Sequence, residues 1–316
     1  MMTEVPFGKI AEGCSRIWND LIGKQEELGL CLSRSRDGVS LLDCGIAVPG
    51  SREAGCLITE LVQGSLSSAE LLPGKAAECF LPSVSVESYS PSDGVYGMQV
   101  ARNQDGIMLS GPMRMLLEKE TDPAAGKCDR SGFALAVLQT DTFPADEWMR
   151  KLARDIACEP CRMKLLLVPM ASEAGCTQIA GRMNENVIYT LVRCLRMDPS
   201  CVESIRGISP VCPVYGRSET GTLCPDDLLH YAAKVELTMK VPEGEGGRIA
   251  AQLCFSSSSS YGKMFADLLQ EAGGDFYRIP DLMNMNKVAE IALKDSVTDR
   301  VFHAGKTEWE RLEPYL

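Results

Sequence analysis

Apolar runs and amphipathic segments alternate between residues 133 and 195, and this alternation constrains the fold more than any other feature of the sequence. Residues 133–140 and 165–170 have the length and the apolar character of buried strands, whereas residues 144–157 and 177–195 have the spacing of amphipathic helices. Strands that alternate with helices form a largely parallel sheet covered by helices. The sequence therefore predicts an α/β lobe in the middle of the chain.

The chain is long enough for a second lobe, because its 316 residues exceed the size at which single hydrophobic cores usually stop growing. Loop-like composition at residues 121–130 and 242–247 marks two candidate crossings between lobes. We expect residues 1–125 together with 245–316 to form the first lobe, and residues 126–244 to form the second. The predicted fold class is α/β, with two α/β lobes.

The charge balance limits the choice of partners. The sequence has 43 acidic and 32 basic side chains, which gives a net charge of −11. Nucleic-acid binding needs clustered Lys and Arg, so nucleic acid is not an expected partner. No apolar run approaches the roughly 18 residues of a membrane span, and residues 1–10 lack the basic-then-apolar pattern of a signal peptide. We expect a cytoplasmic protein that does not bind a membrane.

The fourteen cysteines are scattered through a long chain without an export signal, which favours reduced thiols over a disulfide framework. Cys158 and Cys161 have redox or zinc spacing, but a structural zinc site needs a second such pair and none exists. Two reduced thiols in a turn are the favoured interpretation of this pair. The two histidines, His230 and His303, are too few for a histidine-rich metal site, and we expect each to be a partly buried imidazole.

A stripe of polar residues follows one face of the helix expected at residues 177–195. Gln178, Arg182, Glu185 and Tyr189 share this face because they are spaced by three or four residues. On spacing alone, Arg182 and Glu185 would form a solvated ion pair worth a few tenths of a kcal/mol. The stripe does not by itself identify a site.

Seven segments, in this order along nearly the whole chain, match one known pattern: D-C-G-I-A-V-P-G at residues 43–50, S-G-P at 110–112, T-Q-I-A-G-R-M-N-E at 177–185, G-I-S-P-V-C-P at 207–213, S-S-S-S-S-Y-G-K at 256–263, G-D-F-Y at 274–277 and F-H-A-G at 302–305. Together they resemble the methenyltetrahydromethanopterin cyclohydrolase family. The collinear order is more specific than any single segment.

The resemblance implies two α/β lobes with a pterin cleft between them, no metal and no redox cofactor, and a homotrimer. It implies that the R-x-x-E pair, Arg182 and Glu185, forms the reaction centre. It also suggests five contacts to the pterin substrate: Gln178, Tyr189, Asp226, Ser259 and Lys263. The implied activity is hydrolysis of 5,10-methenyl-tetrahydromethanopterin, or a related methenyl-tetrahydropterin, to the 5-formyl form in the one-carbon metabolism of methanogenesis.

The chemistry fits these two residues. The methenyl group is an amidinium-like cation, so the enzyme needs to deliver water rather than to activate the carbon. Glu185 would take a proton from the attacking water and return it to the departing nitrogen. Arg182 would orient the carboxylate or bind a polar edge of the pterin, and would keep the carboxylate ionised. Lys263, Arg217 and Arg114 are candidates to receive the acidic tail of the coenzyme, with surface solubility as the alternative role.

Two segments depart from the family pattern and leave two alternatives open. The family's T-N-D followed by Y-G-G is C-P-D at residues 224–226 and Y-A-A at 231–233 here, and its A-G-W is Y-G-M at 96–98. One alternative is therefore a non-catalytic pterin-binding or regulatory paralogue, and the other is a cyclohydrolase that acts on a folate.

Overall fold

The computed structural model describes residues 7–74, 80–117, 134–214, 217–218 and 221–316, and they divide into two compact units. The first unit comprises Met1–Ala69 and Ser92–Gln178, and the second comprises Glu70–Pro91 and Ile179–Leu316. Each unit contains a six-stranded sheet together with helices. The prediction of an α/β fold with two lobes is confirmed.

The sheet of the first unit has the order β1-β2-β8-β7-β6-β5. Its central strands β2, β8 and β7 run parallel, and the outer strands are antiparallel to their neighbours. The strands are β1 (Cys31–Arg34), β2 (Ser40–Asp43), β5 (Arg102–Gln104), β6 (Ile107–Ser110), β7 (Leu135–Gln139) and β8 (Lys164–Leu167). The two strands expected at residues 133–140 and 165–170 are therefore the parallel pair β7 and β8.

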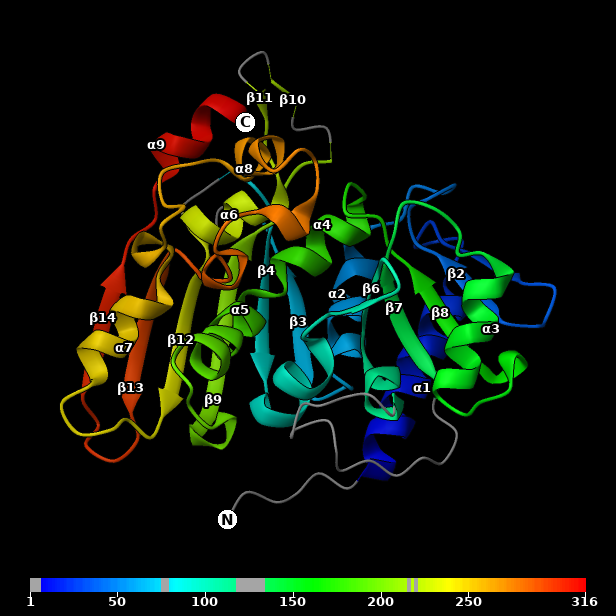
Figure 1. Ribbon diagram of the computed structural model, residues 1–316, viewed down its shortest axis with the longest axis horizontal. Coiled ribbons are helices and arrows are strands. Elements are labelled where there is room, and N and C mark those ends of the chain that lie inside the picture. The colour runs from blue at the N-terminus through cyan, green and yellow to red at the C-terminus, as the bar shows by residue number, and fades with distance from the viewer. Residues whose placement is uncertain (1–6, 75–79, 118–133, 215–216, 219–220) are drawn as a thin grey trace. The chain divides into compact units, whose positions relative to one another are not determined.

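Helices cover both faces of this sheet. Leu135 and Val137 of β7 pack with α1 (Phe7–Gly23) and α2 (Arg52–Val62), whereas Ala136 and Leu138 pack with α3 (Asp146–Asp155). Successive side chains of a strand point to opposite faces, so one apolar run supplies both cores. The blue α1 and the green α3 can be followed along the chain in Figure 1. The unit also contains α4 (Glu173–Ala180), a π-helix at Pro91–Gln99 and short 3₁₀ turns.

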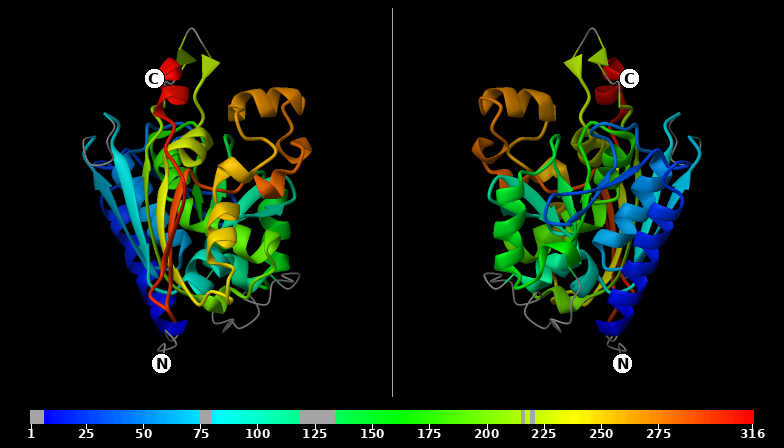
Figure 2. Two further views of the ribbon diagram at one scale, coloured as in Figure 1. Left: turned by 90° about the vertical axis from the view of Figure 1, so that its left-hand side faces the viewer. Right: turned by 90° about the vertical axis from the view of Figure 1, so that its right-hand side faces the viewer.

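The sheet of the second unit has the order β14-β13-β12-β9-β4-β3. Its strands are β3 (Ser67–Leu72), β4 (Ser83–Ser88), β9 (Val202–Pro210), β12 (Lys234–Met239), β13 (Glu290–Asp295) and β14 (Val301–Gly305). The helices of this unit are α5 (Met183–Tyr189), α6 (Pro225–Ala232), α7 (Gly246–Leu253), α8 (Phe265–Glu271) and α9 (Trp309–Leu312). The short hairpin β10 (Arg217–Ser218) and β11 (Gly221–Thr222) stands apart from this sheet. Helix α7 lies on one side of β13 and β14 in the side views (Figure 2).

The observed division of the chain differs from the expected lobes. Residues 245–316 belong with the R-x-x-E segment and not with the first sheet, because β13 pairs in parallel with β12 across the expected crossing at residues 242–247. Parallel neighbours need a crossover connection, and α7 lies within this one. The other expected crossing, at residues 121–130, lies outside the described residues.

The single long helix expected at residues 177–195 is broken, so that prediction is wrong. Helix α4 ends at Ala180, Gly181 and Arg182 form a turn, and α5 begins at Met183 and passes into a π-helical turn at Thr190. The polar stripe therefore does not lie on one continuous helix. No helix among the described residues is long and apolar enough to span a membrane.

Candidate active site

Arg182 and Glu185 form an ion pair at the start of α5. Arg182 Nη2 lies 2.6 Å from Glu185 Oε2, and the two side chains are 12% and 10% exposed. The pair is therefore almost enclosed, and the solvated surface pair suggested by spacing alone is not what forms. An ion pair with so little access to water is less screened than a surface pair, and it is held more firmly in one geometry.

The first turn of α5 is seated directly on the second sheet. The side-chain amide of Asn184 donates to Val86 O and to Ser88 Oγ on β4, at 3.2 Å each. On β9, a Cβ added at Gly207 would lie 2.5 Å from Met183 Cγ, so only glycine lets the helix approach this closely. These contacts hold the two residues that directly precede Glu185.

Asp226 and Tyr189 add two further polar groups around the ion pair. Asp226 stands in the first turn of α6, where burial raises its pKa to about 6 against the opposing effect of the Arg182 charge. Burial also raises the pKa of Tyr189, and the charge of Glu185 acts in the same direction. The charges of Arg182 and Glu185 thus reach Asp226 and Tyr189, so four of the seven predicted site residues form one electrostatic group.

Ser259 and Lys263 lie on the turn that follows the serine run. Ser259 Oγ donates to Asp281 Oδ2 at 3.1 Å, and Lys263 Nζ contacts both carboxylate oxygens of Glu271 at 2.7 and 2.8 Å. Both side chains are exposed and already have partners. A substrate that binds Lys263 would have to compete with Glu271 for its ammonium.

Helix α6 connects this turn to Asp226. The hydroxyl of Tyr231 donates to Lys263 O at 2.8 Å and accepts from Gly262 N at 3.1 Å. One turn earlier, the carboxyl of the fully buried Asp227 accepts from Cys224 N at 2.9 Å and from Phe265 N at 2.7 Å. Neither residue was predicted as a support of the site, although an acidic pair directly after Cys224-Pro225 is a recognisable helix-start signal.

The remaining predicted contacts lie in other surroundings. Gln178 is buried in α4 within the first unit, and its Nε2 has no hydrogen-bond partner among the described residues. Arg114 is also buried in the first unit, and its Nη1 donates to Val100 O at 2.7 Å and to Tyr96 O at 3.3 Å. The hypothesis that Arg114 receives an acidic tail is therefore wrong, because its guanidinium binds backbone carbonyls. The side chain of Arg217 lies outside the described residues.

The histidines and the C-E-P-C pair take no part in this group. His230 is fully buried and stacks on Phe255 at 4.0 Å, and burial lowers its pKa to about 3. His303 is exposed on β14, so the expectation of two partly buried imidazoles is wrong for both. Cys158 and Cys161 are free thiols at a 3₁₀ turn, as predicted. Among the described residues, no group of three or more His, Cys, Asp or Glu side chains could hold a metal ion.

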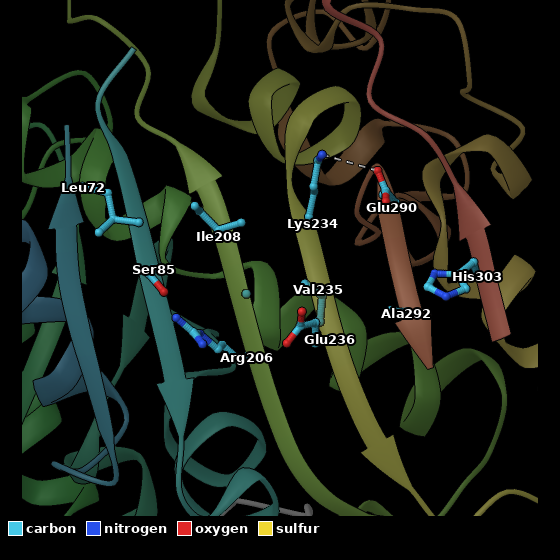
Figure 3. Close-up of a pocket in the computed structure, with 11 residues that line it drawn as sticks. Leu72, Ser85, Arg206, Ile208, Lys234, Val235, Glu236, Glu290, Ala292 and His303 are labelled. Atoms are coloured by element: carbon cyan, nitrogen blue, oxygen red, sulfur yellow. Dashed lines mark ion pairs between the residues drawn. The ribbon is translucent and has the colours of Figure 1, made fainter. Parts of the chain in front are cut away.

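A cavity of about 420 Å³ lies on the open face of the second sheet (Figure 3). Arg206 and Glu236 line it beside Lys234 and Glu290, whose Nζ and Oε2 lie 3.8 Å apart, and His303 stands on the neighbouring strand. Its charges are balanced, and none of the predicted site residues is among the described residues that line it. We therefore place the candidate site at Arg182 and Glu185 and not in this cavity.

Comparison with known proteins identifies related chains. A family model described as Cyclohydrolase (MCH) matches residues 10–314. The methenyltetrahydromethanopterin cyclohydrolase of Methanothermobacter marburgensis is 31% identical over 94% of this chain and 95% of its own. The enzymes of the same name from Methanobrevibacter smithii and Methanocaldococcus jannaschii are each 29% identical, over 90% and 95% of this chain and 91% and 95% of their own.

Proposed function

Because the chain belongs to the MCH cyclohydrolase family, as its collinear segments predicted, we propose that it hydrolyses 5,10-methenyl-tetrahydromethanopterin to the 5-formyl form. The relatives that carry this enzyme name align over nearly their whole length and over nearly the whole of this chain. The observation that carries the proposal is the enclosed Arg182–Glu185 pair, because a carboxylate held in this way suits the proton transfers that the reaction needs.

In the first step, water adds to the bridging carbon of the cationic methenyl group. The water oxygen forms a bond to that carbon, and the Glu185 carboxylate takes one proton from the water. The product of this step is a neutral carbinolamine. The carboxylate also stabilises the positive charge of the substrate before the attack, in a site where water screens it little.

In the second step, the carbinolamine opens. Its hydroxyl loses a proton to solvent as the carbon–oxygen double bond forms, the bond from carbon to N10 breaks, and Glu185 returns its proton to N10. One water is consumed and one proton is released overall, so the step needs no oxidant or reductant. Arg182 contacts Glu185 from the preceding turn and orients its carboxylate.

The other predicted residues are proposed to bind the carrier. Asp226 and Tyr189 carry charges or dipoles beside the reacting pair, and Ser259 and Lys263 lie on the turn that Tyr231 holds against α6. Gln178 is proposed as a further contact, because its buried Nε2 has no protein partner among the described residues. No metal or redox cofactor enters this scheme.

The proposal is tested by mixing the purified protein with methenyl-tetrahydromethanopterin, and separately with methenyl-tetrahydrofolate, while the absorbance of the conjugated methenyl chromophore is followed. We expect rapid loss of absorbance with the methanopterin derivative. Acceleration with only the folate derivative would identify a folate cyclohydrolase. No acceleration with either derivative would identify a non-catalytic paralogue.

We also propose that the protein works in the cytoplasm as a homotrimer, which rests on the family resemblance. Sedimentation equilibrium of the purified protein tests the second statement. A molecular mass near three times the 34.4 kDa of one chain is expected, and a mass of one or two chains would contradict it.

A further inference from the structure

Lys287 is a fully buried lysine that the reaction scheme does not use. Its side chain has no exposed surface, and its one hydrogen-bond partner among the described residues is Ser257, with 2.7 Å between Nζ and Oγ. Burial lowers its pKa, and the charged or titratable groups around it are Cys194, Asp281 and Cys254. No carboxylate of the described residues lies within ion-pair distance of its ammonium. Burying a lysine with so few partners is unfavourable for the free energy of folding, which suggests that Lys287 serves another role.

The partner of Lys287 is the second residue of the serine run. Ser257 Oγ accepts from Lys287 Nζ and donates its own proton to Cys254 O at 2.8 Å, with Gln252 O at 3.2 Å. The hydroxyl is thereby fixed in one rotamer. This bond closes the 3₁₀ turn that leads into Ser259 and Lys263.

Two further contacts join the same segments. Phe255 N donates to Val288 O at 2.8 Å, directly beside Lys287 in the sequence. Ser259 Oγ donates to Asp281 Oδ2, so the serine run is attached to residues 281–288 at both of its ends. Among these contacts, only the bond from Lys287 has a donor side chain without exposed surface.

Residues 281–288 also contact the segment that continues from α5. Thr190 Oγ1 lies 2.5 Å from Asn286 O, and Cys194 Sγ lies 3.5 Å from Met283 O. Thr190 follows Glu185 by little more than one helical turn. Residues 281–288 are therefore held between the segment that carries the reacting carboxylate and the serine run.

We propose that Lys287 is a positioning residue: through Ser257, it sets the place of the serine run relative to Glu185, and so determines how tightly the pterin carrier is held. This inference rests on the proposed function, in which Ser259 and Lys263 contact the carrier. Glu185 is held separately by the seating of Asn184 on β4, so loss of Lys287 should weaken binding more than it slows the chemical step.

The test compares Lys287→Met, Ser257→Ala and the double variant. Methionine has a similar length and needs no hydrogen bond, so the thermal midpoint should stay level or rise. We expect KM for methenyl-tetrahydromethanopterin to rise by about tenfold while kcat changes by less than about threefold, which is the pattern of lost binding without a lost chemical step. The double variant should match the single variants, because both remove one bond.

A matched control is Lys294→Met, which removes an exposed lysine on β13 that pairs with Asp299 and lies outside these segments in the sequence. Its KM should not change. Parental KM in a folded Lys287→Met protein would overturn the proposal, and so would additive effects in the double variant. If Lys287→Met fails to fold, the KM of Ser257→Ala tests the proposal instead, because this substitution removes the same bond from a partly exposed turn.

A binding measurement separates this proposal from the proposed function. In the Glu185→Gln background, equilibrium binding of methenyl-tetrahydromethanopterin should weaken by about the same tenfold when Lys287→Met is added. A parent protein that binds this compound without hydrolysing it would refute the proposed function, and weaker binding by Lys287→Met would still support the positioning role. Unchanged binding would refute the positioning role alone, and a parent protein that does not bind the compound would refute both.

Discussion

Replacing Glu185 by glutamine removes the proposed base and leaves the shape of the site nearly unchanged. Glutamine has the same length, and its amide oxygen can still accept a hydrogen bond from Arg182. A lost general base lowers turnover by about 10²- to 10⁴-fold, which corresponds to a rise of roughly 3–5 kcal/mol in the activation free energy. We expect this loss in kcat and little change in KM.

The effect on folding should be much smaller. Breaking a buried ion pair costs about 3–5 kcal/mol when one charge is left alone, but here the glutamine amide oxygen can still face Arg182, and the charge of Arg182 also acts on the carboxyl of Asp226. We therefore expect a cost of about 1–2 kcal/mol in the free energy of unfolding. From a typical stability of about 5–15 kcal/mol this leaves almost all of the protein folded, so unfolding cannot account for the loss of turnover.

The assay follows the decrease in absorbance of the methenyl chromophore at one wavelength with saturating substrate. Thermal melting is measured on the same preparation. Glu245→Gln is the matched control, because Glu245 and Arg248 also form an ion pair three residues apart, at the start of α7, with side chains 40% and 60% exposed. The control should keep parental kcat. A Glu185→Gln protein that turns over within about threefold of the parent would refute the assignment of the base.

Three further outcomes are expected. Arg182→Lys keeps the charge but loses the planar fork, so kcat should fall by about tenfold or more with little change in thermal midpoint; parental kinetics would show that the guanidinium only neutralises charge. Burial raises the pKa of Asp227 to about 7, so protonation of Asp227 favours the folded state. The free energy of unfolding of the parent, relative to that of Asp227→Asn, should therefore fall as the pH rises from 4 to 7, as measured by urea unfolding at each pH. The opposite trend would mean that the two backbone donors hold the carboxylate ionised. Cys158→Ser with Cys161→Ser, and treatment of the parent with EDTA, should each leave kcat unchanged, and a loss of activity in a folded protein would reveal a metal or redox role.

The sequence predicted the strands and helices of the first sheet more accurately than it predicted the division of the chain. The apolar runs of β7 and β8 are buried on both faces, so their identity as strands needs no tertiary information. The loop-like residues 242–247 were taken as a crossing between lobes, but they connect β12 to α7 within one unit. Local composition shows that a turn occurs there. It does not show which strand β13 pairs with, because the pairing of β13 with β12 joins residues 56 positions apart.

The break between α4 and α5 shows a second limit. Gly181 costs a helix only about 1 kcal/mol relative to alanine, so the helical pattern of residues 177–195 continues across it in the sequence. Packing decides the outcome, since Asn184 bonds to β4 and Met183 lies against Gly207. A single contact at Gly207 could not be predicted from periodicity, although the glycine belongs to one of the family-like segments.

The break between α4 and α5 changes the environment of the R-x-x-E pair, Arg182 and Glu185. In a continuous exposed helix, residues three apart make a weak pair that water and salt screen. Here Arg182 precedes the first residue of α5 and Glu185 lies in its first turn, where the unpaired backbone N–H groups favour a carboxylate. The same spacing therefore gives an enclosed 2.6 Å contact at a helix start, with Asp226 at the start of α6 as a second carboxyl. The family pattern identified the two residues, and the seating of α5 on the sheet accounts for how they are held.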